Sequence, residues 1–474
     1  MALFFLSLFL LILGYLIYGV IVEKIFNISP NHQTPAVTYA DGVDYMPLSP
    51  WRVFLIQFLN IAGLGPVFGA ILGALYGPVC LFWIVLGSIF AGGVHDYLSG
   101  MISMCYRGRT LSYFVEIFLG KKFCIFFLFV LVVLLLIVGS IFAKTPAMML
   151  SMLVGMDFTW WLLIIFAYYF LATLLPIDKI VGHLYPFFAA ALLLATVLLM
   201  GALMLGHYDF YPDLHTLNQN PTGKPIFPLM FITIACGALS GFHATQSPMM
   251  ARCLTNEKYG RPIFYGAMIL EGVVALIWAT LSIAFFHGTS GLNEALGATG
   301  NAGKVVSDIS QGLLGSWGKI LTVTSIVLLA ITSGDTALRS ARLSLADFFK
   351  IRQQNLRNRL VLSLMIFACA MALAFIDLNK IWLYFGWTNQ MLATIMLWIG
   401  ALYLKHKNRF YFIALLPAVF MTAVCGTYFG YSNLMLAQSL NISVIIGIVI
   451  SLFITVCFFV FSKNFKGKSC HAIK

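Results

Sequence analysis

Two short stretches decide the fold: IAGLGP at Ile61–Pro66 and CGALSGFHATQSP at Cys236–Pro248. Each interrupts an apolar run that is long enough to cross a bilayer, 53–77 in the first case and 226–250 in the second. Glycine removes side-chain restraint on the backbone and proline removes a hydrogen-bond donor, so we expect both helices to unwind in mid-membrane and restart. A pair of broken helices is typical of a transporter with its binding site between the breaks.

The composition of the whole chain also indicates a membrane protein. Of its 474 residues, 61% are hydrophobic and 9% are charged, and the mean hydropathy is +0.96. Soluble domains carry roughly 25% charged residues, so this chain cannot cover a water-exposed surface. A cytosolic enzyme, a secreted disulfide scaffold and a disordered protein are therefore excluded. The nine cysteines form no CxxC pair and predict neither a metal site nor a disulfide framework.

The apolar runs predict an all-α polytopic membrane protein with about thirteen transmembrane helices. The predicted spans are 2–22, 53–77, 79–105, 123–143, 159–175, 186–205, 226–250, 263–286, 318–338, 358–376, 381–403, 410–429 and 441–462. We expect a peripheral first helix in 1–22, two five-helix halves in 53–205 and 226–403, and two further helices in 410–462. Because the breaks lie five spans apart, and an odd number of spans reverses orientation, the halves are predicted to be inverted repeats.

The basic residues fall on one side of the predicted spans. Of the 28 Lys and Arg residues, 23 follow odd-numbered spans, and the other five are Lys144, Lys224, Lys304, Lys319 and Lys380. Positive residues favour the cytoplasmic side, so we expect the N-terminus outside and the C-terminus in the cytoplasm. This asymmetry explains the net charge of +12 without nucleic acid. We expect the run Arg339–Arg359 to be a cytoplasmic loop beside anionic lipid.

The breaks predict how a small acid could bind. Pro66 and Pro248 suit the first turn of a restarted helix, where no donor is needed, and Ser247 lies where an N-cap is expected. The free amides after each proline, Val67–Gly69 in the first break, would then hold a carboxylate, because a helix N-terminus carries about half a positive charge. Alternatively, the two prolines only kink the helices and aid packing.

A cation could bind beside the first break. The unwound carbonyls of Ala62 and Gly65 are one possible side of that site, and the hydroxyls of Thr332 and Ser333 are the other. The alternative is that each hydroxyl bonds back to the carbonyl four residues earlier in its own helix.

Ionisable groups inside spans are costly, so each is a candidate for function. Asp96 and Glu271 are the candidate proton sites; the alternative is a structural carboxylate, bonded to His95 in the case of Asp96. His243 lies within the second break, where it is either a substrate ligand or a satisfied polar group.

Two further polar pairs stand out. Asp335 and Arg339 are four residues apart, so they share a helix face and form either a gate or a structural pair. Asn389 and Gln390 interrupt an apolar run, where they either line the pathway or bond between helices.

Several stretches, in this order, carry a resemblance: IAGLGPVFGAILGALYG, GGVHDYLSGMISMCYRGRTL, PIDKIVGHLYP, SGFHATQSPMMAR with GAMILEG, TSGDTALRSAR and FGWTNQMLA. With them the chain resembles the carbon starvation protein A (CstA) family of peptide and pyruvate transporters. The resemblance implies the inverted five-helix core of the amino-acid/polyamine/organocation transporters and a place in the bacterial inner membrane. The family usually has a His pair before its first Gly break, whereas this chain has Ile56 and Gln57 there, so any proton role of that pair is lost or moved.

We therefore predict a cation-coupled importer of a short peptide or pyruvate that uses protons or sodium and serves carbon starvation. The expected substrate ligands are Gln57, Asn60, Gly63, Gly65, Pro66, Gly241, His243, Gln246 and Ser247. The expected coupling residues are Ala62, Thr332, Ser333, Asp96 and Glu271, with Asp335 and Arg339 as the gating or structural pair. We expect no enzyme activity, cofactor, metal or nucleic-acid partner, and the sequence identifies no accessory subunit. The alternatives are a non-transporting membrane sensor or assembly subunit, and an intramembrane enzyme.

Overall fold

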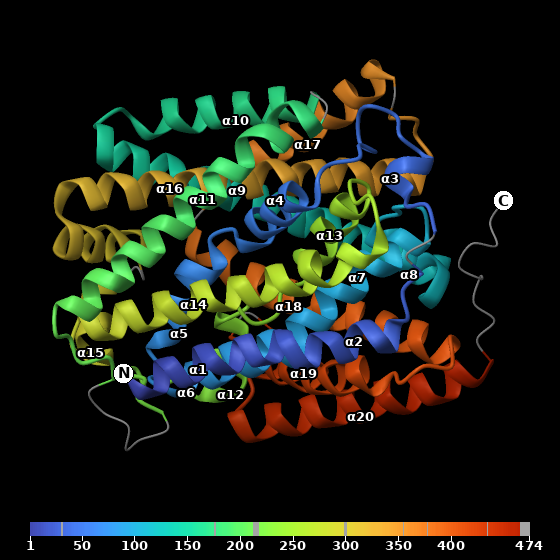
Figure 1. The fold of residues 1–474 in the computed structure, drawn as a ribbon. Helices are drawn as coiled ribbons and strands as arrows, with labels where there is room; N and C mark the ends of the chain where they lie inside the picture. Colours follow the sequence, from blue (N-terminus) through green and yellow to red (C-terminus); the bar gives the residue numbers. More distant parts are fainter. Residues whose placement is uncertain are drawn as a thin grey trace.

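The computed structural model of the chain is a bundle of long helices that run side by side (Figure 1). It describes residues 1–29, 32–174, 177–211, 218–297, 301–353, 355–376, 378–433 and 435–464, without the side chains of 173–184, 377–383 and 464. Most of the PIDKIVGHLYP stretch therefore lies outside the described side chains. The helices are α1 (Ala2–Leu13), η1 (Gly14–Tyr18), α2 (Gly19–Phe26), α3 (Pro35–Thr38), α4 (Pro50–Ala62), η2 (Gly65–Gly69), α5 (Ala70–Ala74), α6 (Val79–Leu86), η3 (Gly87–Gly92), α7 (Gly93–Cys105), α8 (Leu111–Leu119), α9 (Lys121–Val154), α10 (Phe158–Leu174), α11 (Ile177–Leu205), α12 (Ile226–Thr233), α13 (His243–Ala251), η4 (Glu257–Tyr259), η5 (Arg261–Tyr265), α14 (Gly266–Phe285), α15 (Thr289–Leu296), α16 (Ala302–Phe349), α17 (Leu356–Ala374), α18 (Leu378–His406), α19 (Phe412–Tyr431) and α20 (Leu440–Asn464).

The helices are long and apolar enough for a multi-pass membrane protein. Nine stretches of the described residues can cross a bilayer by length and composition, and α4 with η2 and α5 makes a tenth when that bent pair is one span. The three other predicted spans coincide with α10, with α12 and α13, and with α18. The total of thirteen crossings and the inverted-repeat relation stay predictions.

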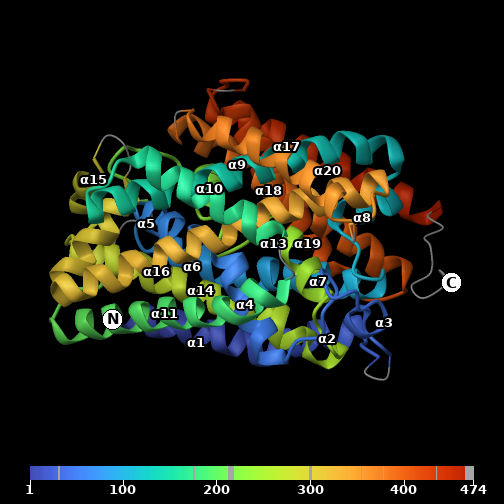
Figure 2. The same ribbon diagram turned by 90° about the horizontal axis from the view of Figure 1, so that it is seen from above.

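The bundle has two ends that differ in charge. Two views place α15 at one end and α3 with α8 at the other, and α1 begins at the end opposite to the one where α20 stops (Figures 1 and 2). The end with α3 and α8 carries Arg107 and Arg109, and we call it the basic end. By the distribution of Lys and Arg it is the predicted cytoplasmic end.

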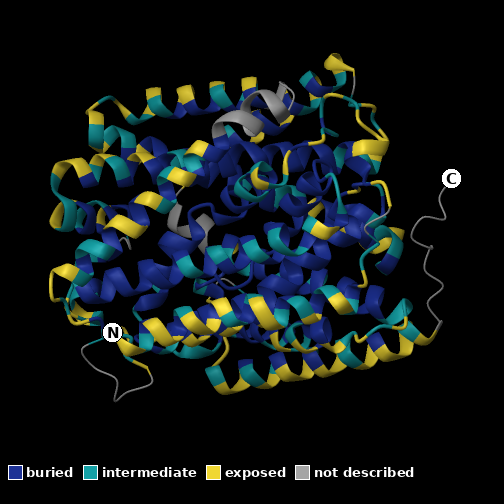
Figure 3. Cartoon of the chain, viewed as in Figure 1, coloured by how far each residue is buried: buried dark blue, intermediate teal, exposed yellow. Residues whose placement is uncertain are grey.

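Burial separates the inner helices from the outer ones. Figure 3 shows exposed residues along the outer helices α1, α10 and α20, whereas α7, α13 and α14 are almost entirely buried. The exposed side chains of α20 include the large apolar residues Ile445, Leu452 and Phe453. Their solvent is therefore lipid, and the polar side chains described next lie in the inner helices.

Both predicted helix breaks are confirmed. The first helix stops at Ala62, and Gly63 adopts φ +45° and ψ −151°, a backbone conformation that residues other than glycine rarely adopt. The chain restarts at Gly65 after a bend of 52°. The second helix stops at Thr233 and restarts at His243, so nine residues between them lie outside regular helix.

The predicted cytoplasmic loop Arg339–Arg359 is wrong in its extent. Helix α16 continues to Phe349, and α17 begins at Leu356. Arg339 and Arg342 consequently lie on a helix and are buried. The sequence misled here because clustered arginines are usually solvated, whereas tertiary packing covers these.

Candidate functional site

The two breaks lie in direct backbone contact. A Cβ placed on Gly65 would overlap the Cβ of Cys236, and one placed on Gly237 would lie 3.5 Å from the Cα of Pro66. Only a residue without a side chain allows the first of these approaches. The sequence pointed to breaks that face each other, and the structure brings them together in a closed, fully buried arrangement.

A chain of ionisable side chains ends at the second break. Oδ1 of Asp96 lies 2.7 Å from Nδ1 of His95, and Oδ2 of Asp96 lies 3.0 Å from Nδ1 of His243. Nε2 of His243 lies 3.5 Å from Oε2 of Glu271, whose Oε1 accepts a hydrogen bond from the amide of Gly237 at 3.0 Å. We call His95, Asp96, His243 and Glu271 the buried relay, and each of its side chains is completely buried.

The helices explain how the relay is held. His95 and Asp96 lie in the first turn of α7, His243 is the first residue of α13, and Glu271 lies in α14. Two imidazoles that alternate with two carboxylates can hold or pass protons, because an imidazole can accept a proton at one ring nitrogen and donate one from the other. Buried ionisable groups in a membrane protein are costly, and they mark ion and proton pathways.

The thiol of Cys236 adds a third ligand type to this place. Ligand atoms of Cys236, His243 and Glu271 lie within 4.8 Å of one another. Such a set can hold a metal ion as well as a proton. The sequence did not predict this group, because the three residues come from the break, from α13 and from α14 and share no spacing.

The amide pair on α18 bonds between helices. Oδ1 of Asn389 accepts from the amide of Phe242 at 2.8 Å, and the Asn389 carbonyl accepts from the amide of Gly241 at 3.2 Å. Nε2 of Gln390 donates to the carbonyl of Leu239 at 3.0 Å. These contacts satisfy backbone groups that unwinding leaves without helical partners. Asn389 and Gln390 therefore bond between helices, one of the two roles that their sequence left open.

The predicted helix start at Pro248 is wrong. Helix α13 begins at His243 with Phe242 as its N-cap, and Pro248 lies inside the helix, so Ser247 is not an N-cap. Proline at this point deprives the carbonyl of Ala244 of its helical donor, and the hydroxyl of Ser99 approaches that carbonyl at 3.4 Å instead. The helix therefore restarts at His243, five residues before Pro248, and the unwound segment consists of the Gly-rich residues before it.

The first break follows its prediction more closely. Pro66 lies in the first turn of the restarted helix η2, as expected. The amide of Phe68, one of three that we expected to be free, donates to the carbonyl of Leu64 at 2.8 Å. That amide therefore does not point free into a site.

Three polar side chains close to the breaks retain unpartnered atoms. Gln57 donates from Nε2 to the Ser247 hydroxyl at 3.0 Å, which joins the helix before the first break to the helix after the second. Oε1 of Gln57, both amide atoms of Asn60 and Oε1 of Gln246 are buried without hydrogen-bond partners. Buried amides are normally satisfied, so these atoms indicate a place for a polar ligand or water.

The hydroxyls proposed for a cation have protein partners. Ser333 donates to the carbonyl of Leu59 at 3.1 Å, and Ser333 Oγ lies 3.6 Å from a Cβ built on Gly63. Thr332 donates back along its own helix at 2.9 Å, but to the carbonyl of Leu329 three residues earlier and not to the one four residues earlier that the alternative expected. Ser333 thus reaches the first break beside Ala62, and a cation role for these residues stays a prediction.

Asp335 and Arg339 each contact another helix. Asp335 accepts a hydrogen bond from the hydroxyl of Tyr185 at 2.8 Å. Arg339 donates from Nη2 to the carbonyl of Ala172 at 2.5 Å. Both side chains are buried, and their role as a gate stays a prediction.

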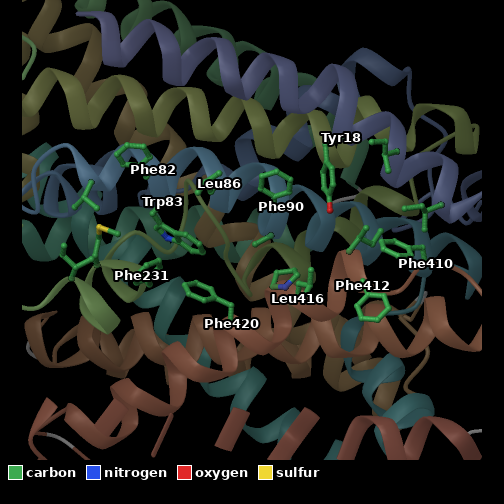
Figure 4. A pocket seen from close by; sticks show the side chains of 18 residues that line it. Tyr18, Phe82, Trp83, Leu86, Phe90, Phe231, Phe410, Phe412, Leu416 and Phe420 are labelled. Carbon is green, nitrogen blue, oxygen red and sulfur yellow. The ribbon is translucent and has the colours of Figure 1, made fainter. Parts of the chain in front are cut away.

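Two hollows lie away from the breaks. One of about 770 Å³ is lined almost wholly by apolar side chains such as Phe82, Phe90, Leu416 and Phe420, which Figure 4 shows between the helices. Several of these side chains are exposed on the outer surface, so its chemistry fits an acyl chain. A second hollow of about 250 Å³ lies at the basic end and includes Arg107 and Arg109.

Two contacts of the second break had no sequence signal. The hydroxyl of Ser88 donates to the carbonyl of Gly237 at 2.9 Å, and Trp83 donates to the carbonyl of Ile234 at 3.1 Å. Both donors come from the third predicted span, which has only an apolar pattern there.

The chain is similar to several known membrane proteins. A family model described as "Carbon starvation protein CstA" matches residues 1–152, 145–311 and 289–428. An "Uncharacterized membrane protein" of Haemophilus influenzae is 45% identical over 348 residues, which cover 62% of this chain and 94% of that protein. The "Peptide transporter CstA" of Bacillus subtilis is 27% identical over 532 residues, with coverages of 90% and 89%. The "Pyruvate/proton symporter BtsT" of Escherichia coli is 29% identical over 323 residues, with coverages of 54% and 45%.

A solved structure shares the arrangement of helices. The crystal structure of MhsT in complex with L-phenylalanine superposes with a TM-score of 0.58 and covers 88% of this chain and 99% of MhsT. The two sequences are 11% identical, so the likeness concerns the fold alone.

Proposed function

The chain belongs to the carbon starvation protein CstA family, and on that premise we propose that it is a proton-coupled importer of a small carboxylate-bearing nutrient. The names of its relatives support two substrate classes, short peptides and pyruvate. The shared fold with MhsT and the two broken helices support a carrier with its site at the breaks. The expected place is the bacterial inner membrane, with the basic end in the cytoplasm.

The observation that carries the proposal is the buried relay. It connects α7, α13 and α14 and binds the unwound backbone through the contact between Glu271 and Gly237. An ionised carboxylate accepts a hydrogen bond from an amide more strongly than a protonated one does. Loading Glu271 with a proton therefore weakens its hold on the second break. Proton binding and movement of the break are coupled by this one contact.

The unpartnered amides offer the substrate its ligands. Asn60 has both a donor and an acceptor free, and Gln57 and Gln246 each have a free acceptor. The donor of Asn60 can bind a carboxylate oxygen, and free acceptors suit hydroxyl or N–H groups of a substrate. A peptide also needs a carboxylate for its ammonium group. Asp96 and Glu271 already bind protein groups, which favours a monoacid such as pyruvate.

Proton coupling is favoured over sodium coupling by the chemistry of the relay. Its two buried carboxylates and two imidazoles are groups that take up protons. The hydroxyls of Thr332 and Ser333 donate to carbonyls and keep their oxygen lone pairs for a cation, but neither residue supplies a negative charge for it.

A non-transporting sensor is the second candidate, and the direct contact between the breaks favours it. A sensor needs no cavity there, whereas a carrier must open one during its cycle. The buried unpartnered amides argue for the carrier, because a permanently closed core would leave them unsatisfied.

Uptake into proteoliposomes tests the proposal. Radiolabelled pyruvate and di- and tripeptides are offered under a proton gradient alone and a sodium gradient alone. We expect accumulation that depends on the proton gradient and is lost in Glu271→Gln, with no loss in the matched control Glu294→Gln, whose side chain is exposed on α15. Absence of uptake of every substrate, or uptake that no gradient drives, contradicts the proposal.

A further inference from the structure

A cluster of buried arginines lies between the breaks and the basic end. It comprises Arg252 after α13, Arg339 and Arg342 on α16, and Arg359 on α17, around Asp44 of the segment before α4. Arg342, Arg339 and Arg252 are only 0%, 1% and 3% exposed. Arginine is almost never buried so completely unless an anionic or hydrogen-bonding partner is present.

The electrostatics of Asp44 show that these charges act on one place. Burial raises the pKa of the Asp44 carboxyl, but Arg342 lowers it, followed by Arg252, Arg339 and Arg359. The net effect is a pKa below the ordinary value of an aspartate. One carboxylate therefore lies in the field of four guanidinium groups.

Among the side chains that the structure describes, the acidic groups nearby do not balance these charges. Asp44 lies 3.6 Å from Nη2 of Arg342, and Asp347 binds both Arg109 and Arg252. A further carboxylate, Asp335, lies one turn from Arg339 on α16 and accepts from Tyr185. Within the described part of the chain, four buried guanidinium groups and that of the exposed Arg109 thus meet three carboxylates. Excess positive charge in a buried place calls for an anion.

Donor atoms of two arginines lack partners. Arg339 binds the carbonyl of Ala172 through Nη2, while its Nε and Nη1 are buried without a hydrogen-bond partner. Arg342 donates from Nη1 to Gln353, and its Nε is likewise unpartnered. The two residues are three positions apart and hence share a face of α16. Guanidinium N–H groups without partners are strong donors for the oxygens of a carboxylate.

The position of the cluster links it to the breaks. Ser340, between the two arginines in sequence, donates to the carbonyl of Thr245 at 3.1 Å and contacts Gln246 at 3.4 Å. On the other side of the cluster, Arg252 donates to the carbonyl of Gly108 at 2.7 Å, beside the hollow at the basic end. The arginines therefore lie between the unpartnered amides and that hollow.

We propose that Arg339 and Arg342 form a second anion site, which receives the carboxylate of the substrate after it leaves the breaks and before it reaches the basic end. This inference rests on the proposed function for the identity of the anion, but the site itself rests on the free donors. Asp44 competes with the carboxylate for Arg342, so the anion is held and then released. An inorganic anion such as chloride or phosphate would use the same donors.

Ligand-dependent thermal stability of the full chain in nanodiscs tests the site. Pyruvate, acetate, chloride and inorganic phosphate are titrated at constant ionic strength, and a bound anion raises the melting temperature. We expect the carboxylates to stabilise the native protein and Arg339→Gln to weaken their apparent affinity about tenfold or more. The control Arg357→Gln removes an exposed arginine of α17 and should leave the affinity unchanged.

Further variants keep the test decisive. Arg339→Lys retains the charge but loses the planar set of N–H donors, so we expect it to lower the affinity as well; it keeps the test open if Arg339→Gln does not fold. Equal stabilisation by chloride or phosphate at the same concentrations overturns the carboxylate role. An Arg339 variant that binds carboxylates as the native protein does overturns the site. Carboxylate binding that depends on Arg339 but occurs without any uptake would leave the site standing and remove the proposed function.

Discussion

Glu271 on α14 accepts a hydrogen bond from the amide of Gly237, in the middle of the second break, at 3.0 Å. The other oxygen of the same carboxylate faces His243 at 3.5 Å. A single buried side chain thus holds both the unwound backbone and the end of the relay. This relationship makes the second break sensitive to one proton.

Substitutions of Glu271 should separate the two roles in stability measurements. Glutamine keeps an oxygen for the amide of Gly237, so we expect Glu271→Gln to melt close to the native protein. Glu271→Ala leaves that amide without an acceptor and opens a void, at a cost of about 2–4 kcal/mol. Thermal unfolding in detergent measures the difference. Equal melting temperatures for the two variants would contradict the hydrogen bond.

Asn389 should be more important for stability than its polar character suggests. Asn389→Ala removes the acceptor of the Phe242 amide and the bonds to Ser240, so we expect a loss of about 2–3 kcal/mol. The matched control is Asn441→Ala on the exposed face of α20, for which we expect less than about 0.5 kcal/mol. If both variants melt alike, Asn389 does not hold the break.

Gly65 should tolerate no side chain. Gly65→Ala places a Cβ on the Cβ of Cys236, and we expect a loss of about 1–3 kcal/mol together with impaired uptake. The double variant with Cys236→Gly should recover part of the stability, because the clash is removed. Gly201→Ala is the control, since its Cβ would meet open space in α11 and should be neutral or slightly stabilising. An unimpaired Gly65→Ala would show that the breaks are further apart.

Asp44 should make the stability of the folded protein depend on pH in the acidic range. Its pKa is lowered in the folded protein, because the arginines overcome the effect of burial. Its ionised form therefore stabilises the fold above the unfolded pKa of about 3.9, and this contribution is lost as the pH falls through the folded value. We expect Asp44→Asn to lower the melting temperature at pH 7 and the deficit to shrink below about pH 4.

The exposed residue Asp209 supplies the control for that pH series. Asp209→Asn should give little deficit at any pH, since its side chain is exposed and surface ion pairs contribute about 0–1 kcal/mol. A deficit of Asp44→Asn that stays constant down to low pH would contradict the electrostatic account.

The sequence located the breaks because their causes are local. Gly63 and Pro66 alter the backbone at their own positions, so a single run of residues predicts the interruption. The start of α13 was misplaced for a related reason. Pro248 is a strong local signal, but the contacts of the preceding segment with Asn389 and Glu271 decide where the helix resumes.

By itself the sequence determined that this is an all-helical membrane protein with two interrupted helices. The apolar composition requires lipid surroundings, and each Gly or Pro alters the backbone at its own position. Only the tertiary structure decided which groups satisfy the interrupted backbone and which charges share the interior. Asp96 meets His243, and Arg342 meets Asp44, between segments that are distant in the chain. Such pairs carry no periodicity, since the partner of a buried polar group is set by packing in three dimensions.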